Sequence, residues 1–216
     1  GSLEQIPCPL GTWQSEAGQN SCIDANPGHY VNITYGENAA LKISSGKEQT
    51  CAINMNYRLY CWGGNYDGQL GFNIYNGAMT TAMPGLVEIG DKQFMDVSTS
   101  RNYLSGVGTE SHSCAITTDS DVYCWGGGNT SAYNIGLPGP ATKISVGGAS
   151  SCAIIDNGSV YCWGSNWFGQ LGIGWRGNDG PANWTGCDDY CTPLLPENSV
   201  AVDISVGEVH ACAVMN

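Results

Sequence analysis

Short runs in which apolar and polar residues alternate are the main pattern along this 216-residue chain. The clearest run reads Cys152-Ala-Ile-Ile-Asp-Asn-Gly-Ser-Val-Tyr-Cys162, with apolar residues on both sides of Asp156-Asn157-Gly158. Alternation with a period of two is typical of a β-strand, and a three-residue loop with Gly in the left-handed conformation is typical of a β-hairpin. The sequence therefore predicts a hairpin folded about Asn157.

The same frame, from a Cys-Ala-Ile start to a Tyr-Cys-Trp-Gly end, occurs three times. Nine residues separate its two cysteines in each copy, and the pairs are Cys51 and Cys61, Cys114 and Cys124, and Cys152 and Cys162. Folding the hairpin places the paired cysteines opposite each other, about 4.5 Å apart at Cα, within the range of a disulfide. Zinc sites usually have two to four residues between cysteines, so we expect disulfides here, each stabilising the fold by ~2–3 kcal/mol.

Two further features of the cysteines concern the setting of the protein. Cys187 and Cys191 are expected to close a five-residue loop, whereas Cys212 opens another hairpin whose second cysteine would lie ten residues further on. We therefore expect the chain to be a piece of a longer protein. Because disulfides persist in oxidising compartments, we expect an extracellular or cell-surface location. Four Asn-x-Ser/Thr sequons agree with secretion and are candidate glycosylation sites: Asn32, Asn129, Asn157 and Asn183.

An internal repeat is visible ahead of the hairpins. The segments Ile43-Ser-Ser-Gly46, Ile144-Ser-Val-Gly147 and Ile204-Ser-Val-Gly207 each begin eight residues before a hairpin cysteine. Asp96-Val97-Ser98 is the matching start of another unit, which carries nine extra residues before Cys114. Repeats of this length indicate a solenoid or a propeller, and we expect units at 43–96, 97–143 and 144–203, with a fourth over 204–216.

A second signature follows the hairpins and carries a family resemblance. It reads Cys61-Trp-Gly-Gly-Asn-Tyr-Asp-Gly-Gln-Leu-Gly71 and Cys162-Trp-Gly-Ser-Asn-Trp-Phe-Gly-Gln-Leu-Gly172, while Cys124-Trp-Gly-Gly-Gly128 keeps the front half. Over residues 43–216 the chain resembles the repeats of the regulator of chromosome condensation family. The resemblance implies an all-β fold, a β-propeller of four-stranded blades. We expect about three and a half blade units of an incomplete propeller.

Residues 1–30 have a different character. Cys8-Pro-Leu-Gly-Thr-Trp13, Ser21-Cys22 and Pro27-Gly28-His-Tyr30 resemble the small cysteine-rich repeats of ephrin receptors and tumour-necrosis-factor receptors. Ala25 stands where that pattern has a third cysteine, so the resemblance leaves Cys8 and Cys22 as a disulfide pair. Residues 31–42 are interpreted as a linker or a first strand. Because such repeats occur in large secreted or cell-surface proteins, we expect the chain to be part of a larger multidomain protein.

Composition and charge exclude several partners. Hydrophobic residues make up 42% of the chain, charged residues only 12%, and the formal net charge is −12. Nucleic acids and acidic membrane surfaces would be repelled, so neither is an expected partner. No run of 18 apolar residues is present, so no membrane insertion is expected within this segment. The acidity favours solubility; a basic or calcium-bridged partner is the alternative.

Catalytic and metal-binding patterns are missing from the sequence. The three histidines are His29, His112 and His210, and the last two lie two residues before a hairpin cysteine. A structural strand position is the favoured interpretation, with a metal or catalytic role as the alternative. The chain lacks the common hydrolase and phosphate-binding motifs, and Gly126-Gly-Gly128 is interpreted as a turn. We therefore expect no enzyme activity, no cofactor and no metal.

The long insertion after Leu171 carries the candidate binding residues. It runs from Gly172 to Cys191, and rigid aromatic side chains on a stapled loop are suited to binding. The residues expected to be presented are Trp175, Trp184, Asp188, Asp189 and Tyr190. The alternative is a stapled surface loop without a function. Tyr66 and Trp167, at matched places in the signature, are expected to contribute packing only.

The function predicted on these grounds is an extracellular protein-binding or adhesion module built on a β-propeller scaffold. Its partner is an unknown protein or glycan, and a carbohydrate-binding, lectin-like propeller is the alternative, because aromatic residues beside carboxylates suit sugars. The family resemblance also implies nucleotide exchange on a nuclear GTPase, which the paired cysteines and the acidic charge disfavour. A secreted β-lactamase inhibitor also resembles these repeats, so the resemblance further implies inhibition of a secreted enzyme as an alternative function.

Overall fold

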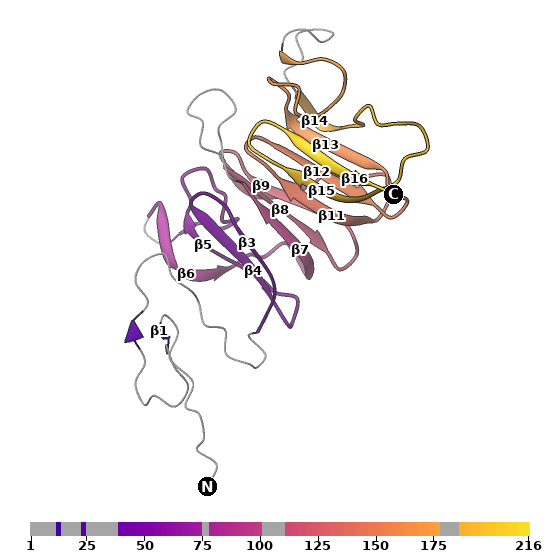
Figure 1. Ribbon diagram of the computed structural model, residues 1–216. Helices are drawn as coiled ribbons and strands as arrows, with labels where there is room; N and C mark the ends of the chain where they lie inside the picture. The colour runs from indigo at the N-terminus through magenta and orange to yellow at the C-terminus, as the bar shows by residue number, and fades with distance from the viewer. Residues whose placement is uncertain (1–11, 14–22, 25–38, 75–77, 101–110, 178–185) are drawn as a thin grey trace.

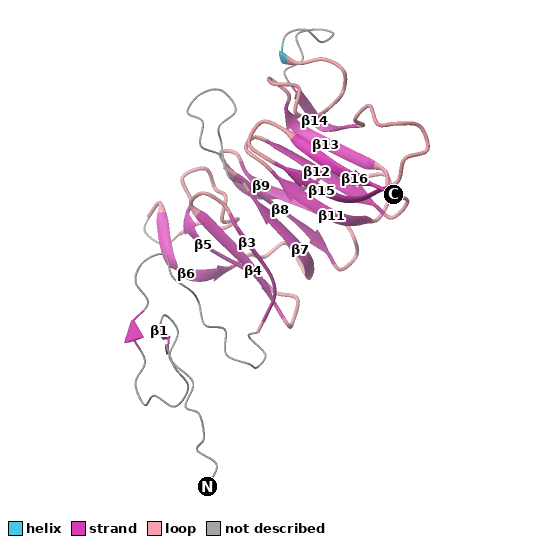
Figure 2. Ribbon diagram, viewed as in Figure 1, coloured by secondary structure: helices cyan, strands magenta, loops and turns pink. Residues whose placement is uncertain are grey.

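A computed structural model describes residues 12–13, 23–24, 39–74, 78–100, 111–177 and 186–216 of the chain. Nearly all of the regular structure in these residues is β-strand (Figure 2). Two short strands, β1 (Thr12–Trp13) and β2 (Ile23–Asp24), pair near the N-terminus. The expected pair Cys8 and Cys22 lies outside the described residues. Within the described part of the chain, no helix is long and apolar enough to span a membrane.

The remaining strands form four antiparallel sheets, which we call blades 1 to 4 in chain order (Figure 1). Blade 1 contains β3 (Ala40–Ser45), β4 (Gln49–Asn54), β5 (Leu59–Gly64) and β6 (Thr80–Leu86). Blade 2 contains β7 (Phe94–Thr99), β8 (His112–Thr117), β9 (Val122–Gly126) and β10 (Asn129–Asn134). Blade 3 contains β11 (Ala141–Val146), β12 (Ser150–Ile155), β13 (Val160–Ser165) and β14 (Gly186–Cys191). Blade 4 contains β15 (Ala201–Val206) and β16 (Ala211–Met215).

Each four-stranded blade is a meander in which successive strands pair, as the family resemblance implies. The predicted hairpin joins the second and third strands of each blade. In blade 3 the N–H of Gly158 donates to the carbonyl of Ile155 at 2.9 Å, and Gly158 has φ +80°. Tyr57 in blade 1 and Ser120 in blade 2 hold the same left-handed position, with φ +58° and +67°. The hairpin geometry expected from Asp156-Asn157-Gly158 is therefore confirmed, and two blades adopt it without glycine.

Disulfides staple these hairpins as the cysteine spacing predicts. Three bonds join directly opposed residues of the second and third strands, with Cα atoms 4.0–4.1 Å apart: Cys51–Cys61, Cys114–Cys124 and Cys152–Cys162. Cys187 and Cys191 form a fourth bond, with Cα atoms 6.1 Å apart. Among the described cysteines, Cys212 is free and exposed. Each hairpin bond is fully or almost fully buried, because it faces the next blade.

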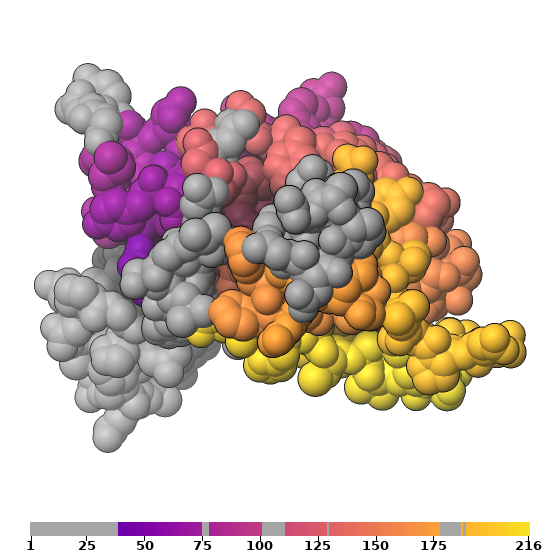
Figure 3. Space-filling model, turned by 90° about the horizontal axis from the view of Figure 1, so that it is seen from above, coloured from indigo at the N-terminus to yellow at the C-terminus, as the bar shows by residue number. Residues whose placement is uncertain are grey.

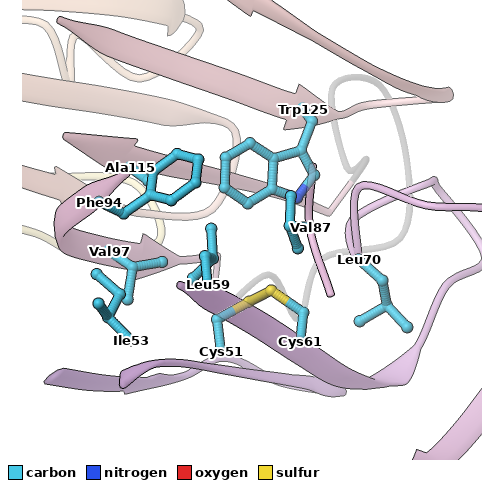
Figure 4. Packing of buried hydrophobic residues seen from close by; sticks show 10 residues of the cluster. All are labelled: Cys51, Ile53, Leu59, Cys61, Leu70, Val87, Phe94, Val97, Ala115 and Trp125. Atoms are coloured by element: carbon cyan, nitrogen blue, oxygen red, sulfur yellow. A yellow bond between two sulfur atoms is a disulfide. The ribbon is translucent and has the colours of Figure 1, made fainter. Parts of the chain in front are cut away.

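The hydrophobic core lies between the blades rather than within one of them. Figure 4 shows the contact of blades 1 and 2, where Trp125 from β9 faces the Cys51–Cys61 bond and lies beside Val87. Trp125 is completely buried, and its indole N–H donates to the carbonyl of Gln69 at 3.0 Å. Trp163 occupies the corresponding place between blades 2 and 3. Stacking of this kind is how repeat proteins bury faces that one repeat leaves open.

The first strands of neighbouring blades are tied together by a recurring serine. The Oγ atoms of three equivalent serines accept hydrogen bonds from backbone N–H groups of the next blade: Ser44 from Thr99 at 3.1 Å, Ser98 from Val146 at 2.9 Å and Ser145 from Val206 at 2.9 Å. Each of these serines follows the Ile or Val at the start of a repeat. Viewed from above, the blades follow one another around the molecule in chain order (Figure 3). The fold is thus an incomplete β-propeller, as predicted.

Candidate functional site

The signature Trp-Gly-x-Asn-x-x-Gly-Gln-Leu-Gly positions the insertion of blade 3. Asn166 is fully buried; its Oδ1 accepts from the N–H of Leu171 at 3.0 Å, and its Nδ2 donates to the carbonyl of Trp175 at 2.7 Å. Gln170 closes the same turn by accepting from the N–H of Phe168 at 3.0 Å. The buried side-chain amide of Asn166 therefore fixes both the turn of the repeated signature and the start of the insertion that follows it.

Blade 1 uses its copy of the signature in the same way. The Oδ1 of Asn65 accepts from the N–H of Leu70 at 2.9 Å, and its Nδ2 donates to the carbonyl of Phe72 at 3.0 Å. The side chain of Gln69 accepts from the N–H of Asp67 at 2.9 Å. Because the same side-chain amide hydrogen bonds hold the turn in both blades, the insertion of blade 3 begins at a turn that is already rigid.

Behind that turn, a hollow of about 370 Å³ opens at the outer side of blade 3. Its lining residues are Ile173, Trp175, Tyr190, Cys191 and Thr192. The ring of Tyr190 meets the ring of Tyr161 edge to face, with centroids 5.1 Å apart and an interplanar angle of 86°. The Cys187–Cys191 bond closes the strand that carries Tyr190. The aromatic wall of the hollow is thus held by a disulfide, a ring contact and the Asn166 clamp.

The structure brings together two of the five residues proposed from the sequence. Trp175 and Tyr190 are separated by 15 positions in the chain and line the same hollow. Asp189, on β14 next to Tyr190, is exposed. Trp184 lies outside the described residues, as does the side chain of Asp188. The aromatic pair is therefore the candidate site, and Asp189 is adjacent to Tyr190 in sequence but does not line the hollow.

The sequence pattern did not indicate the exposed aromatic side chains of the signature as candidate binding residues. Tyr66 exposes 61% of its surface, so the expectation that it serves packing only is wrong. Its counterpart Trp167 exposes 37% and lies against Gly177, while the next residue, Phe168, exposes 61%. These residues fill the variable positions between Asn and Gly-Gln-Leu-Gly. The signal in the sequence is that the residues between Asn and Gly-Gln-Leu-Gly differ between the two copies; the structure shows that the turn is held by backbone and amide groups, so these side chains can face solvent.

The two described histidines, His112 and His210, do not line the hollow. His112 Nε2 and Ser151 Oγ are 2.7 Å apart across the contact of blades 2 and 3, and Ser151 is fully buried. The carbonyls of His112 and His210 accept equivalent turn hydrogen bonds, from Ser100 and Gly207 respectively. His29 lies outside the described residues. Within those residues, no group of three or more His, Cys, Asp or Glu side chains is arranged to hold a metal ion.

Four-stranded blades that are stacked through tryptophans and stapled hairpins define this chain as a β-propeller protein. Comparison with known families then identifies the repeat. Residues 107–131 and 141–170 match one model of the regulator of chromosome condensation (RCC1) repeat, and residues 157–214 match another. The chain therefore contains RCC1 repeats, as the sequence resemblance indicated. No curated protein sequence matches the chain.

Solved structures share the fold at low sequence identity. Human WBSCR16 is 14% identical, with a TM-score of 0.66, over 82% of this chain and 45% of that one. Prp20p from Saccharomyces cerevisiae is 17% identical, with a TM-score of 0.63, over 82% and 43%. The CRINKLY WD40 ectodomain of the Arabidopsis thaliana receptor kinase ACR4 is 19% identical, with a TM-score of 0.51, over 82% and 49%. The chain thus spans less than half the length of these structures.

Proposed function

We propose that this protein is an extracellular binding module that holds a protein partner against the hollow formed by Trp175 and Tyr190. The observation that carries the proposal is the convergence of these two aromatic side chains on one rigid, stapled wall. Aromatic side chains lose little conformational freedom on binding and dominate the energetics of many interfaces. A hollow whose described lining is aromatic, aliphatic and hydroxyl-bearing suits recognition better than bond-breaking chemistry, so the proposal includes no enzyme activity.

Three observations support an oxidising, extracellular setting. The four disulfides within the described residues would be rare in a reducing compartment. The solved neighbour from Arabidopsis is an ectodomain of a receptor kinase. Asn157, at an exposed hairpin tip, is open to glycosylation, and its Oδ1 accepts from the N–H of Ser159 in the sequon. A cell-surface or secreted propeller is therefore the setting in which we expect the hollow to act.

Other propellers of this repeat type support a protein partner. The Prp20p structure is described together with its binding to Gsp1p and histones, and yeast RCC1 (Prp20) has been solved with Kap60. A glycan is the second candidate partner, because the aromatic side chains of Trp175 and Tyr190 line one hollow and could pack against the face of a sugar. The net charge of −12 argues against nucleic acid as a partner.

The hollow can be tested with arrays of immobilised extracellular proteins and of glycans, probed with the fluorescently labelled full chain. We expect binding to a protein on the array that falls at least about tenfold in Trp175→Ala, the loss of one buried aromatic anchor. Tyr66→Ala is the matched control, since Tyr66 is an exposed aromatic in the equivalent signature of blade 1. It should bind normally.

The array result separates the candidates. Retention on glycans alone, with the same dependence on Trp175, favours the lectin-like function. Binding that survives Trp175→Ala and falls in Tyr66→Ala overturns the assignment of the hollow. If alkylation of the natively produced protein, without reduction, labels most cysteines, the extracellular setting is refuted.

A further inference from the structure

Blade 3 carries two disulfides in the described chain, whereas blades 1 and 2 carry one each. Its two bonds, Cys152–Cys162 and Cys187–Cys191, belong to one hydrophobic cluster. Three of the four cysteines are almost completely buried there, and Cys191 is only partly buried. The sulfur atoms of both bonds are therefore packed in the same part of the blade, and one of them can be reached from solvent.

The strand register places three of these cysteines in a row across the sheet. The strands β12, β13 and β14 are neighbours in blade 3 (Figure 1). Cys162 on β13 lies directly opposite Cys152 on β12 and, on its other side, directly opposite Cys191 on β14. Opposed Cα atoms of antiparallel strands are about 4.5 or 5.5 Å apart, and both distances are within the range of a disulfide. Cys162 can therefore bond to either neighbour without a change of register.

Among the described four-stranded blades, only blade 3 has this row. On the outer strand of blade 1 the residue opposite Cys61 is Gly85, and on that of blade 2 the residue opposite Cys124 is Tyr133. The hairpin disulfides of blades 1 and 2 thus have no cysteine across from them on the outer strand. Cys191 takes that place in blade 3, so its hairpin disulfide alone has a second possible partner there.

The Cys187–Cys191 bond closes a bulge in β14. Between the positions opposite Cys191 and Cys187, β13 has one residue and β14 has three, and the last of the three is Tyr190. Tyr190 and Cys191 both line the hollow. Breaking this bond would therefore release the aromatic wall of the hollow and would create a thiol directly opposite Cys162.

We infer that Cys191, Cys162 and Cys152 form a thiol–disulfide relay, in which reduction of the Cys187–Cys191 bond is passed on to the hairpin disulfide. A small thiol attacks the sulfur of Cys191, and Cys187 leaves as a thiolate that takes up a proton. A second small thiol then attacks the first at its sulfur, so that a small disulfide is released together with the Cys191 thiolate. Two electrons have passed from the small thiols to the protein.

The last step is internal to blade 3 and involves no further oxidation or reduction. The Cys191 thiolate attacks the sulfur of Cys162; the Cys162–Cys191 bond forms, the Cys152–Cys162 bond breaks, and Cys152 leaves as a thiolate that takes up a proton. A thiolate attacks along the line of the bond that breaks, and three neighbouring strands hold the attacking, central and leaving sulfur atoms in that order. Holding reacting groups in this way strongly favours an internal reaction.

The products suit their surroundings. Cys152 is completely buried, and a free cysteine is well accommodated in an apolar cluster because it behaves as a small hydrophobic side chain. The bulge that carries Tyr190 is no longer closed once the bond has moved. The relay itself does not depend on the proposed function, whereas an effect of the relay on binding at the hollow rests on it.

Two variants, each combined with Cys212→Ser to remove the free thiol, test the relay. Cys187→Ser leaves a Cys191 thiol opposite Cys162, whereas the matched control Cys191→Ser leaves a Cys187 thiol, which lies opposite Gly164. The variants are equilibrated in mildly alkaline solution without denaturant and quenched with acid, and alkylation followed by peptide mass analysis locates the thiols. We expect at least about tenfold more labelled Cys152 in Cys187→Ser than in the control.

The unaltered protein gives a second measurement, which holds even if a variant fails to fold. Mild reduction with glutathione, without denaturant, should yield peptides linked through Cys162 and Cys191. The Cys51–Cys61 bond should stay intact at the same glutathione concentration, since the residue opposite Cys61 on the outer strand is a glycine.

Two results would overturn the inference. One is free Cys187 and Cys191 in the reduced protein with the Cys152–Cys162 bond retained throughout, because the thiol would then not reach its neighbour. The other is equal labelling of Cys152 in both variants, because the hairpin disulfide would then open without help from Cys191. Both results leave the proposed function untouched, since neither measurement involves binding at the hollow.

Discussion

Trp125 and Trp163 occupy equivalent buried positions but differ in one hydrogen bond, so Trp→Phe replacements should destabilise the fold unequally. The indole N–H of Trp125 donates to Gln69, which also accepts from Ser113 Oγ at 2.9 Å. The indole nitrogen of Trp163 is buried without a hydrogen-bond partner. Blade 2 lacks the Gln-Leu-Gly turn that would supply the acceptor.

The size of the difference follows from the energetics of buried polar groups. Both replacements remove the same ring volume, so their cavity terms cancel to first order. Trp125→Phe also loses a hydrogen bond of about 1 kcal/mol, whereas Trp163→Phe removes an unpaired buried donor that costs about 1–3 kcal/mol. Trp125→Phe should therefore lower the free energy of unfolding by at least about 2 kcal/mol more than Trp163→Phe.

Urea unfolding of the two variants, followed by near-ultraviolet circular dichroism with the disulfides intact, measures this difference. With an m value of about 2 kcal/mol/M, the midpoints should differ by about 1 M, with unchanged m as the control. If the two midpoints coincide, or if Trp163→Phe is the more damaging change, the hydrogen bond to Gln69 does not stabilise the contact of blades 1 and 2.

Three further predictions concern single positions. Ser120→Gly should raise the free energy of unfolding by up to about 1 kcal/mol in thermal melts, since Ser120 has φ +67°; a lower melting temperature would contradict this. Gly147→Ala should cost more than about 2 kcal/mol, because its Cβ would collide with the carbonyl oxygen of Gly207, and a neutral effect would exclude that close approach. Hydrogen bonds from the Lys143 side chain and from the Ile204 N–H lower the pKa of Asp203 in the folded protein. The ionised Asp203 therefore stabilises the fold above its unfolded-state pKa, and this stabilisation is lost as the pH falls through its folded-state pKa. NMR titration should show this low midpoint and its rise in Lys143→Ala; an unchanged midpoint would refute the cause.

The hairpins and their disulfides could be predicted because both depend on residues close together in the sequence. Alternation places Cys152 and Cys162 on one face, and the turn at Asn157 sets which residues oppose each other. The short distance between opposed strands then brings the two sulfur atoms within bonding reach. The left-handed conformation of Tyr57 and Ser120 could not be predicted in the same way, since neither residue favours it. The register imposed by the flanking strands overrides that local preference.

The site could be predicted only in part, because its geometry depends on contacts between distant segments. Aromatic residues in a stapled loop suggested Trp175 and Tyr190, but only the fold shows that they line one hollow. The roles of Ser98 and Ser145 could not be predicted either: the repeated serine is plain in the sequence, yet its hydroxyl accepts a hydrogen bond from a residue of the next blade, 48 or 61 positions further on. Such a partner is defined by blade stacking, which periodicity alone does not specify.

Blades 2 and 3 each depart from the regular repeat, and the two departures have opposite consequences for the scaffold. Blade 2 loses the Gln-Leu-Gly turn and leaves the indole of Trp163 without an acceptor, so the departure weakens an interface. Blade 3 keeps the whole signature and adds its insertion after the Asn166 clamp is complete, so the departure leaves the interface turn intact. The described part of the insertion leaves the Asn166 turn intact, carries its own disulfide and lines an aromatic hollow, so it is under separate constraints from the repeat. That separation is the structural reason for proposing that Trp175 and Tyr190 carry the binding function.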